Sequence, residues 1–517
     1  MDRLRRPLDD LGHEPLALNE TDAPAAPGKA PVARSRAEPL DLLPGAGRRA
    51  AALGRRAARD RFSAPVVSRA LGLTQAWYLG RLGFSLLWLW LRTVRPGRPE
   101  AARKEVRRKR REDAARLVVT TLGELKGVFV KAGQFAALRL DLVPAEAQPL
   151  LASLRDRVPP RPLEEIRAVV EAELGAPLET RFRNFSREPI GAASIAQVHR
   201  ATLHDETPVA VKVQYPWLVR SLRADLFWLR RVAFVLAGRH RRFDAGRLFE
   251  EFARGMAEEL DFEREAASAR AIAENLTSER QIVVPEIHAE HSTRRVLTMT
   301  FHPCIPVTDV DRLSTRGIAP ADVVGPIARA YSRQVFIDGL FHADPHPGNL
   351  FVVDEPGAAE RPRILFVDFG LSRRLDPKLR DEIRHALYAL LQRDPGAFLD
   401  GMERLGMIAA GAEEAVAGAI RTMFERLSGV AAPVGLRGEQ VLSLKDEAKA
   451  LLQETPGVQL PNDLLLYART MAYVFSLARE LDPDADVMKL CLPPLLRFLA
   501  EKPTGSAGPA ESDRPGR

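Results

Sequence analysis

One segment, FHADPHPGNLF at residues 341–351, constrains the fold of this chain more than any other. Within it Asp344 and Asn349 are five residues apart, and the two prolines and one glycine between them exclude a helix. Such a loop can direct a carboxylate and a carboxamide at one point. The apolar run RILFV that follows predicts a β-strand ending at Asp368, and Gly370 accepts positive φ, so the strand can turn there.

Phosphoryl transfer requires this set of groups. One carboxylate orients or deprotonates the acceptor, while an amide oxygen and a second carboxylate hold Mg²⁺ against nucleotide phosphates. We therefore assign Asp344 to the acceptor, and Asn349 and Asp368 to a magnesium ion bound with ATP. The triplet D-F-G alone occurs by chance, but H-x-D-x-x-x-x-N followed about twenty residues later by a strand and D-F-G is specific.

Composition narrows the remaining choices. The 517 residues allow two or three domains, and an apolar content of 46% predicts that most of the chain folds. Cys304 and Cys491 lie far apart, which indicates neither a disulfide framework nor a zinc site and is typical of a reducing compartment. We find no signal peptide, and no stretch reaches the ~20 apolar residues of a transmembrane helix.

The chain ends and the segment 71–112 have unusual compositions. Residues 1–70, rich in Ala, Pro, Arg and Gly, predict a disordered arm, and residues 501–517 a disordered tail. Segment 71–112 joins an apolar stretch containing three of the five tryptophans to a basic run. This pattern suits an interfacial helix on an anionic membrane, and equally a helix packed on the domain with a solvated charged helix behind it. No recognition motif for nucleic acid accompanies the basic run, so we expect no nucleic-acid partner.

Three further segments complete the predicted organisation. Residues 113–176 predict helices, and Lys131 and Gln134 share a helix face there. Residues 177–305 predict a lobe built on strands; one of them, 208–214, carries Lys212 among valines and alanines. A lysine on a half-buried strand needs an anion, although a lysine facing solvent is the simpler alternative. Residues 306–500 predict a mainly helical lobe apart from the two motif loops.

An acidic segment supplies candidate anions. Residues 249–270 predict a helix on which Asp261 and Glu265, four residues apart, share one face. Like charges placed so repel unless cations approach from elsewhere, and Lys131 and Lys212 are the candidates. A solvated acidic face is the alternative.

Together these residues resemble the UbiB/AarF family of atypical protein-kinase-like proteins, over roughly residues 115–480. Lys131 and Gln134 match the family's K-x-G-Q signature, and Glu259 and Asp261 match its E-x-D signature. Glu265 is similar to the glutamate that pairs with the strand lysine, Lys212. The alanine-rich nucleotide loop is similar to Gly191, Ala192, Ala193, Ser194, Ile195, Ala196 and Gln197, and Met299 lies on the strand that would meet adenine.

The resemblance implies an α+β, two-lobed protein-kinase-like fold with an N-terminal helical extension over the active site and a mainly helical C-lobe. Lys131 and its neighbours would pair with Glu259 and Asp261 and block a peptide groove. The implied function is a Mg-ATP-dependent kinase or ATPase at the inner face of the bacterial membrane, supporting quinone or isoprenoid-lipid biosynthesis. A protein or small-molecule kinase, and a nucleotide-binding scaffold without turnover, remain as alternatives; the joint presence of Asp344, Asn349 and Asp368 argues against the scaffold.

Three positions depart from familiar patterns. Gly191 stands where many family members have alanine, which permits closer backbone approach to phosphates and favours higher ATP affinity or more kinase-like behaviour. Met299 is followed by Thr300 rather than the usual glutamate, so adenine would be held mainly by backbone groups. Ordinary kinases place a lysine two residues after the catalytic aspartate; here the position is His346, as in the family, and less fixed positive charge would meet the phosphoryl group.

Overall fold

The computed structural model describes residues 68–93, 100–125, 127–138, 160–237, 245–428 and 460–501, with a few positions between them. The arm predicted over 1–70 lies outside this part of the chain except for residues 68–70, which begin the first described helix. The tail predicted over 501–517 lies outside it except for Glu501.

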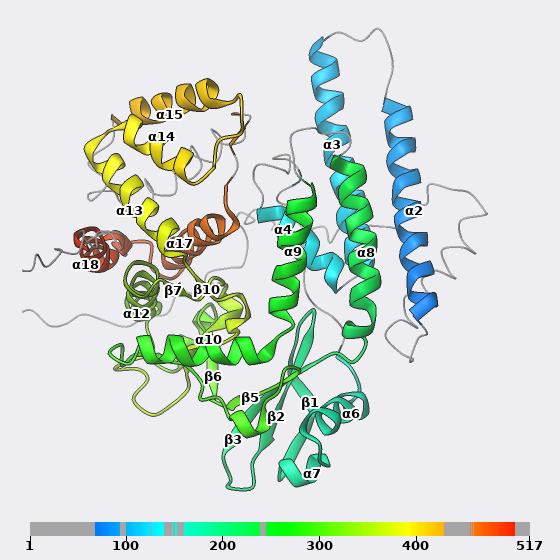
Figure 1. Ribbon diagram of the computed structural model, residues 1–517. Helices are drawn as coiled ribbons and strands as arrows, with labels where there is room; N and C mark the ends of the chain where they lie inside the picture. The colour runs from blue at the N-terminus through cyan, green and yellow to red at the C-terminus, as the bar shows by residue number, and fades with distance from the viewer. Residues whose placement is uncertain are drawn as a thin grey trace, which may run out of the picture. The chain divides into compact units, whose positions relative to one another are not determined.

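Helices from two parts of the chain pack together as one group (Figure 1): α2 (Ser68–Thr93), α3 (Glu100–Leu125) and α4 (Val128–Leu138) from the N-terminal part, and α8 (Leu218–Ala237) and α9 (Ala245–Glu259) from further along the chain. Helix α2 packs against both α3 and α8. Tyr78 of α2 is buried with Leu125 and Phe129, and Gln75 donates a hydrogen bond to the buried Asp225 of α8. One face of the segment predicted to contact a membrane is therefore a packed helix surface. No described helix combines the length and apolar content that crossing a membrane requires.

An antiparallel sheet has the order β1-β2-β3-β5 and is formed by β1 (Asn184–Ala192), β2 (Ala196–Thr202), β3 (Pro208–Gln214) and β5 (Val296–Thr300). Helices α6 (Leu163–Leu174) and α7 (Leu178–Arg181) precede it. Ile166 of α6 shares a core with Val211 and Val213 of β3. Because side chains alternate along a strand, Lys212 projects from the opposite face, toward helix α10.

The segment predicted as one helix over 249–270 is two helices, so that prediction was wrong. Helix α9 ends at Glu259, and α10 (Phe262–Asn275) begins after an extended Asp261, whose carboxylate accepts a hydrogen bond from Arg264 N at 3.3 Å. Asp261 is thus a helix N-cap, a position that favours a short acidic side chain with non-helical backbone. It does not share a helix face with Glu265.

Helix α10 connects two hydrophobic cores. Phe262 and Ala266 pack into the core beneath the first sheet, while Ala269 and Ile272 pack into the core of the helical region. The glutamate between these contacts, Glu265, is held in place by packing on both sides. A four-residue spacing places Glu265 and Ala269 on one face of the helix, so the cores together fix its orientation.

The rest of the chain is mainly helical, as predicted, and the fold is α+β. A second sheet has the order β4-β9-β8-β6 and a two-stranded sheet joins β10 to β7. The strands are β4 (Ile282–Val283), β6 (Cys304–Pro306), β7 (Leu340–Phe341), β8 (Leu350–Val353), β9 (Ile364–Phe366) and β10 (Arg373–Arg374). The helices are α11 (Val310–Thr315), α12 (Pro320–Arg333), α13 (Pro377–Gln392), α14 (Pro395–Arg404), α15 (Glu413–Ser428), α17 (Asn462–Leu481) and α18 (Val487–Ala500).

These short strands present the two motifs. The loop carrying Asp344 and Asn349 connects β7 to β8, and Asp368 follows β9 by two residues. Strand β8 begins at Leu350, which pairs with Phe366 at the end of β9, so both motifs lie at the same end of this strand pair. Strand β4 comes from the segment predicted for the first lobe, but it pairs in parallel with β9.

Candidate active site

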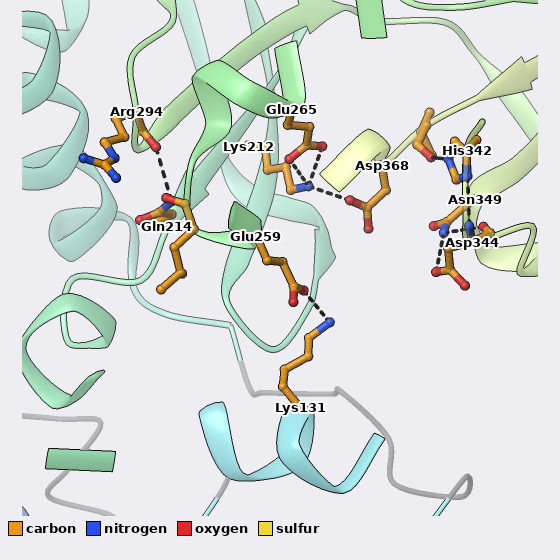
Figure 2. A network of polar contacts seen from close by, with 12 residues as sticks. Lys131, Lys212, Gln214, Glu259, Glu265, Arg294, His342, Asp344, Asn349 and Asp368 are labelled. Atoms are coloured by element: carbon orange, nitrogen blue, oxygen red, sulfur yellow. Dashed lines mark hydrogen bonds and ion pairs between the residues drawn. The ribbon is translucent and has the colours of Figure 1, made fainter. Parts of the chain in front are cut away.

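Lys212 lies at the centre of a cluster of charges (Figure 2). Its Nζ donates to Glu265 Oε1 at 2.8 Å and Oε2 at 2.9 Å, and to Asp368 Oδ1 at 2.9 Å. Strand β3, helix α10 and the turn after β9 thus meet at one ammonium group. The side chains of Lys212 and Glu265 are 11% and 3% exposed, whereas Asp368 is 49% exposed and borders solvent. The sequence predicted that Lys212 needs an anion, and the structure places two carboxylates, Glu265 and Asp368, in contact with it.

The electrostatics follow from this geometry. Burial lowers the pKa of Lys212, but the carboxylates of Asp368 and Glu265 outweigh burial and raise that pKa. Burial raises the pKa of Glu265 to about 7, against the opposing effect of Lys212. For Asp368, burial raises the pKa, but the nearby charge of Lys212, with a smaller contribution from Lys131, lowers it to about 2. Asp368 therefore keeps its negative charge at neutral pH, as a metal ligand must.

Asp368 has a left-handed backbone, with φ of 64° and ψ of 71°. Few described residues other than glycine have positive φ, and a residue held there costs on the order of 1 kcal/mol or more. Gly370, which the sequence marked as able to accept positive φ, does not adopt it; the positive φ occurs two residues earlier, at Asp368 itself. A Cβ at Gly370 would lie 3.5 Å from Asp368 Oδ1 and 3.6 Å from Glu265 Oε2, so this glycine passes close to the two carboxylates.

The loop before β8 is held by its own side chains. Asn349 Nδ2 donates to Asp344 Oδ2 at 2.9 Å and to the Asp344 carbonyl oxygen at 3.1 Å. The buried His342 connects the loop to the end of β9: its Nε2 lies 2.9 Å from the carbonyl oxygen of Val367, and its Nδ1 accepts from Asp344 N at 3.3 Å. With Nδ1 accepting, Nε2 carries the proton and donates. His342 therefore links the backbone at Asp344 to the backbone just before Asp368.

The donor set fits a magnesium ion that is also bound by phosphates. Because the Asn349 amide nitrogen is occupied by Asp344, its carbonyl oxygen is left as an acceptor, and Asp368 offers a partly exposed ionised carboxylate. Magnesium is commonly held by one or two protein oxygens together with substrate phosphates and water. No group of three or more His, Cys, Asp or Glu side chains is arranged for a metal within the described ranges, so a metal cage made by the protein alone is not found there.

The small-residue loop lies between β1 and β2. Gly191 and Ala193 are exposed, Ala192 is half-buried, and Ser194, Ile195 and Ala196 are buried. A Cβ at Gly191 would meet nothing within 4 Å, so its lack of a side chain is not required by packing. On the neighbouring β5, Met299 is half-buried.

Gln197, which we predicted as a nucleotide contact, has a structural set of partners. Its Oε1 accepts from Arg161 N at 2.7 Å, and its Nε2 donates to Arg161 O at 3.1 Å and lies 2.8 Å from His199 Nε2. The residue is fully buried. It anchors the segment before α6 to the sheet.

The K-x-G-Q helix reaches α9. Lys131 Nζ of α4 lies 2.5 Å from Glu259 Oε1, with side-chain exposures of 16% and 13% (Figure 2). Gln134 is half-buried on the same helix. Asp261, the second acid of the E-x-D signature, forms an ion pair with Arg294 at 3.3 Å. We had expected Lys131 and its neighbours to meet both acids; the structure directs Asp261 to α10 and to Arg294.

Two arginines at the site were missed by sequence reasoning. Arg469 of α17 donates to Asp344 Oδ1 at 3.3 Å, and Arg373, three residues after the D-F-G motif, forms an ion pair with Glu258 at 3.1 Å. Arg469 lies 125 residues from its partner, in an amphipathic helix that carries no motif. No sequence signal marked it, whereas the position of Arg373 beside the motif was a usable clue.

Several known proteins are similar to this chain in sequence. A model of the ABC1 atypical kinase-like domain matches residues 153–400. The probable protein kinase UbiB of Xylella fastidiosa is 31% identical over 416 residues, which are 79% of this chain and 73% of that protein. The chloroplastic protein ACTIVITY OF BC1 COMPLEX KINASE 8 of Arabidopsis thaliana is 29% identical, over 77% of this chain and 55% of its own length.

A solved complex of Rv3197 with erythromycin from Mycobacterium tuberculosis superimposes with a TM-score of 0.49 at 25% identity, covering 77% of this chain and all of that one. The family assignment rests on the domain match and on the UbiB relative, because the latter is similar over most of both chains. The fold is accordingly kinase-like, and the chain belongs to the ABC1 atypical kinase-like family.

Proposed function

We propose that this protein binds Mg-ATP and transfers or hydrolyses its γ-phosphoryl group. The observation that supports this most is the contact of Lys212 with both Glu265 and Asp368, because kinase-like sites use such a lysine–glutamate pair and such an aspartate around nucleotide phosphates. A pair serving stability alone would not need the half-exposed Asp368 in a left-handed conformation.

Each residue has a chemical role in this proposal. Lys212, oriented by Glu265, binds the α- and β-phosphates. Asn349 and Asp368 hold Mg²⁺, which neutralises charge on the phosphates when bound. Asp344 accepts a hydrogen bond from the hydroxyl group of the acceptor or from water and aligns its oxygen with the phosphorus atom. The backbone of the loop around Gly191 and Ala193 covers the phosphates, while Lys131 and Gln134 regulate access from the helical extension.

Replacement of Asp368 by Asn tests the proposal directly. We expect D368N to lose magnesium-dependent ATP binding by about a hundredfold or more, because an amide cannot supply the ionised ligand that Mg²⁺ requires. Isothermal calorimetry with ATP, with and without Mg²⁺, measures the effect. Asp354→Asn is the control, because Asp354 lies outside the site in an ion pair with Arg316. Equal Mg-ATP affinity of D368N and the unmodified protein would contradict the proposal.

The fate of labelled phosphate separates the alternatives. Label recovered as inorganic phosphate indicates an ATPase, and label on a protein or small molecule indicates a kinase. Tight binding with no turnover would indicate the scaffold, the role that the joint presence of Asp344, Asn349 and Asp368 argues against.

We further propose a role at the membrane, in support of quinone or isoprenoid-lipid biosynthesis at its inner face. The helical spacing of four exposed apolar residues on α2, at i, i+3, i+4 and i+7, supports it: Phe84, Leu87, Trp88 and Leu91. The Arg92 guanidinium lies 5.2 Å from the Trp88 ring centre, so a cation borders this face. Aromatic residues with adjacent arginines suit the boundary between lipid headgroups and acyl chains.

A second exposed face on α8 has the same chemistry. Phe227 and Phe234 are 51% and 48% exposed, and the guanidinium groups of Arg231 and Arg230 lie 5.0 Å and 5.6 Å from their respective rings. These four residues also follow the i, i+3, i+4, i+7 spacing. The α8 face supports a lipid contact that extends beyond the segment 71–112.

Flotation with liposomes tests the membrane role through point substitutions, since Tyr78 makes removal of all of α2 disruptive. We expect the double variant W88E/L91E to lose binding to vesicles containing anionic lipid, because both carboxylates would face the headgroups. Leu496→Glu is the matched control, since Leu496 is 51% exposed on α18. Equal flotation of the double variant and the control would refute a role for the α2 face.

A further inference from the structure

Helix α17 brings an arginine to the proposed acceptor-activating carboxylate. Arg469 Nη2 donates to Asp344 Oδ1 at 3.3 Å, while Asn349 Nδ2 donates to Asp344 Oδ2 at 2.9 Å. The two carboxylate oxygens are thus held by donors from different parts of the chain. Arg469 and Asp344 are 25% and 21% exposed, so the pair is shielded but still open to solvent on one side.

The arginine is held in place by its own helix. Its guanidinium carbon lies 5.2 Å from the ring centre of Tyr473, one turn further along α17. On the side of α17 that faces the catalytic loop, Leu466 shares a core with Phe341, and Tyr467 contacts the Phe341 ring edge-on at 6.2 Å. Because Phe341 precedes Asp344 by three residues, packing fixes α17 directly against the loop that it serves.

The histidine that replaces the usual lysine does not supply the missing charge. His346 Nδ1 accepts a hydrogen bond from Gly348 N at 3.0 Å, and a ring nitrogen that accepts carries no proton. The side chain is used to cap the short 3-10 turn 347–349. Phosphoryl transfer nevertheless benefits from a fixed cation close to the reacting groups, where water is partly excluded. The guanidinium of Arg469, always charged, lies next to Asp344 instead.

We propose that Arg469 is a positioning residue for phosphoryl transfer: it holds the Asp344 carboxylate toward the acceptor and supplies the fixed positive charge that His346 lacks. This inference rests on the proposed function. In the step, the acceptor oxygen bonds to the γ-phosphorus as the bond from that phosphorus to the β,γ-bridging oxygen breaks. ADP leaves with the electron pair, and the acceptor proton passes to Asp344 or solvent. Arg469 is unchanged and lies outside the segment matched by the family domain, 153–400.

An inhibitory role of Arg469 would predict the opposite effect on turnover. If Arg469 blocked Asp344 by occupying the oxygen that the acceptor needs, its removal would raise turnover. Among the described residues Asn349 is the donor to Asp344 Oδ2, and Arg469 makes a single contact at 3.3 Å with Oδ1; a carboxylate oxygen has two lone pairs, so each can accept a further hydrogen bond. Positioning is therefore the role that we test.

The test compares Arg469→Gln with Arg469→Lys in the full-length protein. We expect R469Q to lower kcat for ATP about tenfold or more, with KM for ATP changed less than about twofold, because the affected charge acts on the reacting groups rather than on nucleotide binding. R469K should recover part of kcat, since it restores charge without the planar donor pair. Arg479→Gln, an exposed position on the same helix, should behave as the unmodified protein.

A second measurement tests whether Arg469 and Asp344 are in contact, independently of ATP turnover. Thermal unfolding without nucleotide of R469Q, D344N and the double variant reports the contact itself: if the pair is real, the two losses in Tm will not add. Additive losses, a raised kcat in R469Q, a change in KM alone, or no recovery in R469K would each overturn the inference. If the unmodified protein turns over ATP and R469Q does so equally well, the inference about Arg469 is overturned and the proposed function stands. If the unmodified protein does not turn over ATP, the proposed function and the inference are both overturned.

Discussion

Two lysine–glutamate pairs lie at the site, and they occupy opposite ends of successive helices. Glu265 lies in the first turn of α10, where the helix dipole favours a carboxylate, and it meets Lys212 of the sheet. Glu259 is the last residue of α9, where the dipole disfavours a carboxylate, and it meets Lys131 of the helical extension. The first pair joins a strand and a helix of the same lobe. In the second, the charge of Lys131, 128 residues upstream, compensates the unfavourable position of Glu259 at the end of α9.

The difference indicates separate purposes. Lys212 is shared with Asp368 and is almost fully buried, and it is the residue that we propose to contact the phosphates. Lys131 joins α4 to α9, two helices that also share the core beneath the first sheet, and its charge also contributes to lowering the pKa of Asp368. The first pair therefore lies where we propose that the nucleotide binds, and the second connects helix α4 of the extension to helix α9.

The largest effect should follow replacement of Lys212 by Met. Glu265 would be left buried without its cation, and removal of one partner of a buried pair costs about 3–5 kcal/mol of unfolding free energy. Urea unfolding measures the loss. The double variant K212M/E265Q should recover part of it, because no buried charge is then unpaired; equal stability of the single and double variants would show that lost packing, not charge, was responsible.

The pH dependence of stability should show a smaller effect of Glu265. Its folded pKa, about 7, lies above the unfolded value of about 4.3, so the contribution of this group to stability is present below about pH 4.3 and lost as the pH rises through 7. The unfolding free energy of the unmodified protein should therefore fall relative to that of Glu265→Gln by on the order of 1–3 kcal/mol across this window. Parallel curves for the two proteins from pH 4.5 to 8 would contradict the raised pKa.

The smallest of the three effects should come from Lys131→Met. Because Lys131 and Glu259 are somewhat more exposed than the inner pair, we expect a loss of about 1–2 kcal/mol, with faster amide hydrogen exchange in α4 and little change elsewhere. Lys109→Met on the exposed face of α3 is the control. A loss as large as that of K212M would remove the distinction between the two pairs.

Much of the local structure was predictable because it depends on neighbouring residues. Helix α6 lies within the segment 113–176 predicted to be helical, and the predicted strand 208–214 coincides with β3, since a short helix followed by Gly175 and a valine-rich strand need no distant information. The prediction failed at 249–270, where hydrophobic periodicity continues through two helices. There the capping role of Asp261 outweighed its place in the pattern.

The sequence by itself determined the chemistry of the site. The spacing of Asp344, Asn349 and Asp368 predicted which groups stand at the turns, and a lysine among valines had to meet an anion. Only the tertiary structure decided which partners meet: Glu265 and Asp368 for Lys212, Glu259 for Lys131, and Arg469 for Asp344. The physical reason is that the spacing of side chains along a helix or strand is set by local geometry, whereas contacts across more than a hundred residues depend on how separate cores pack together.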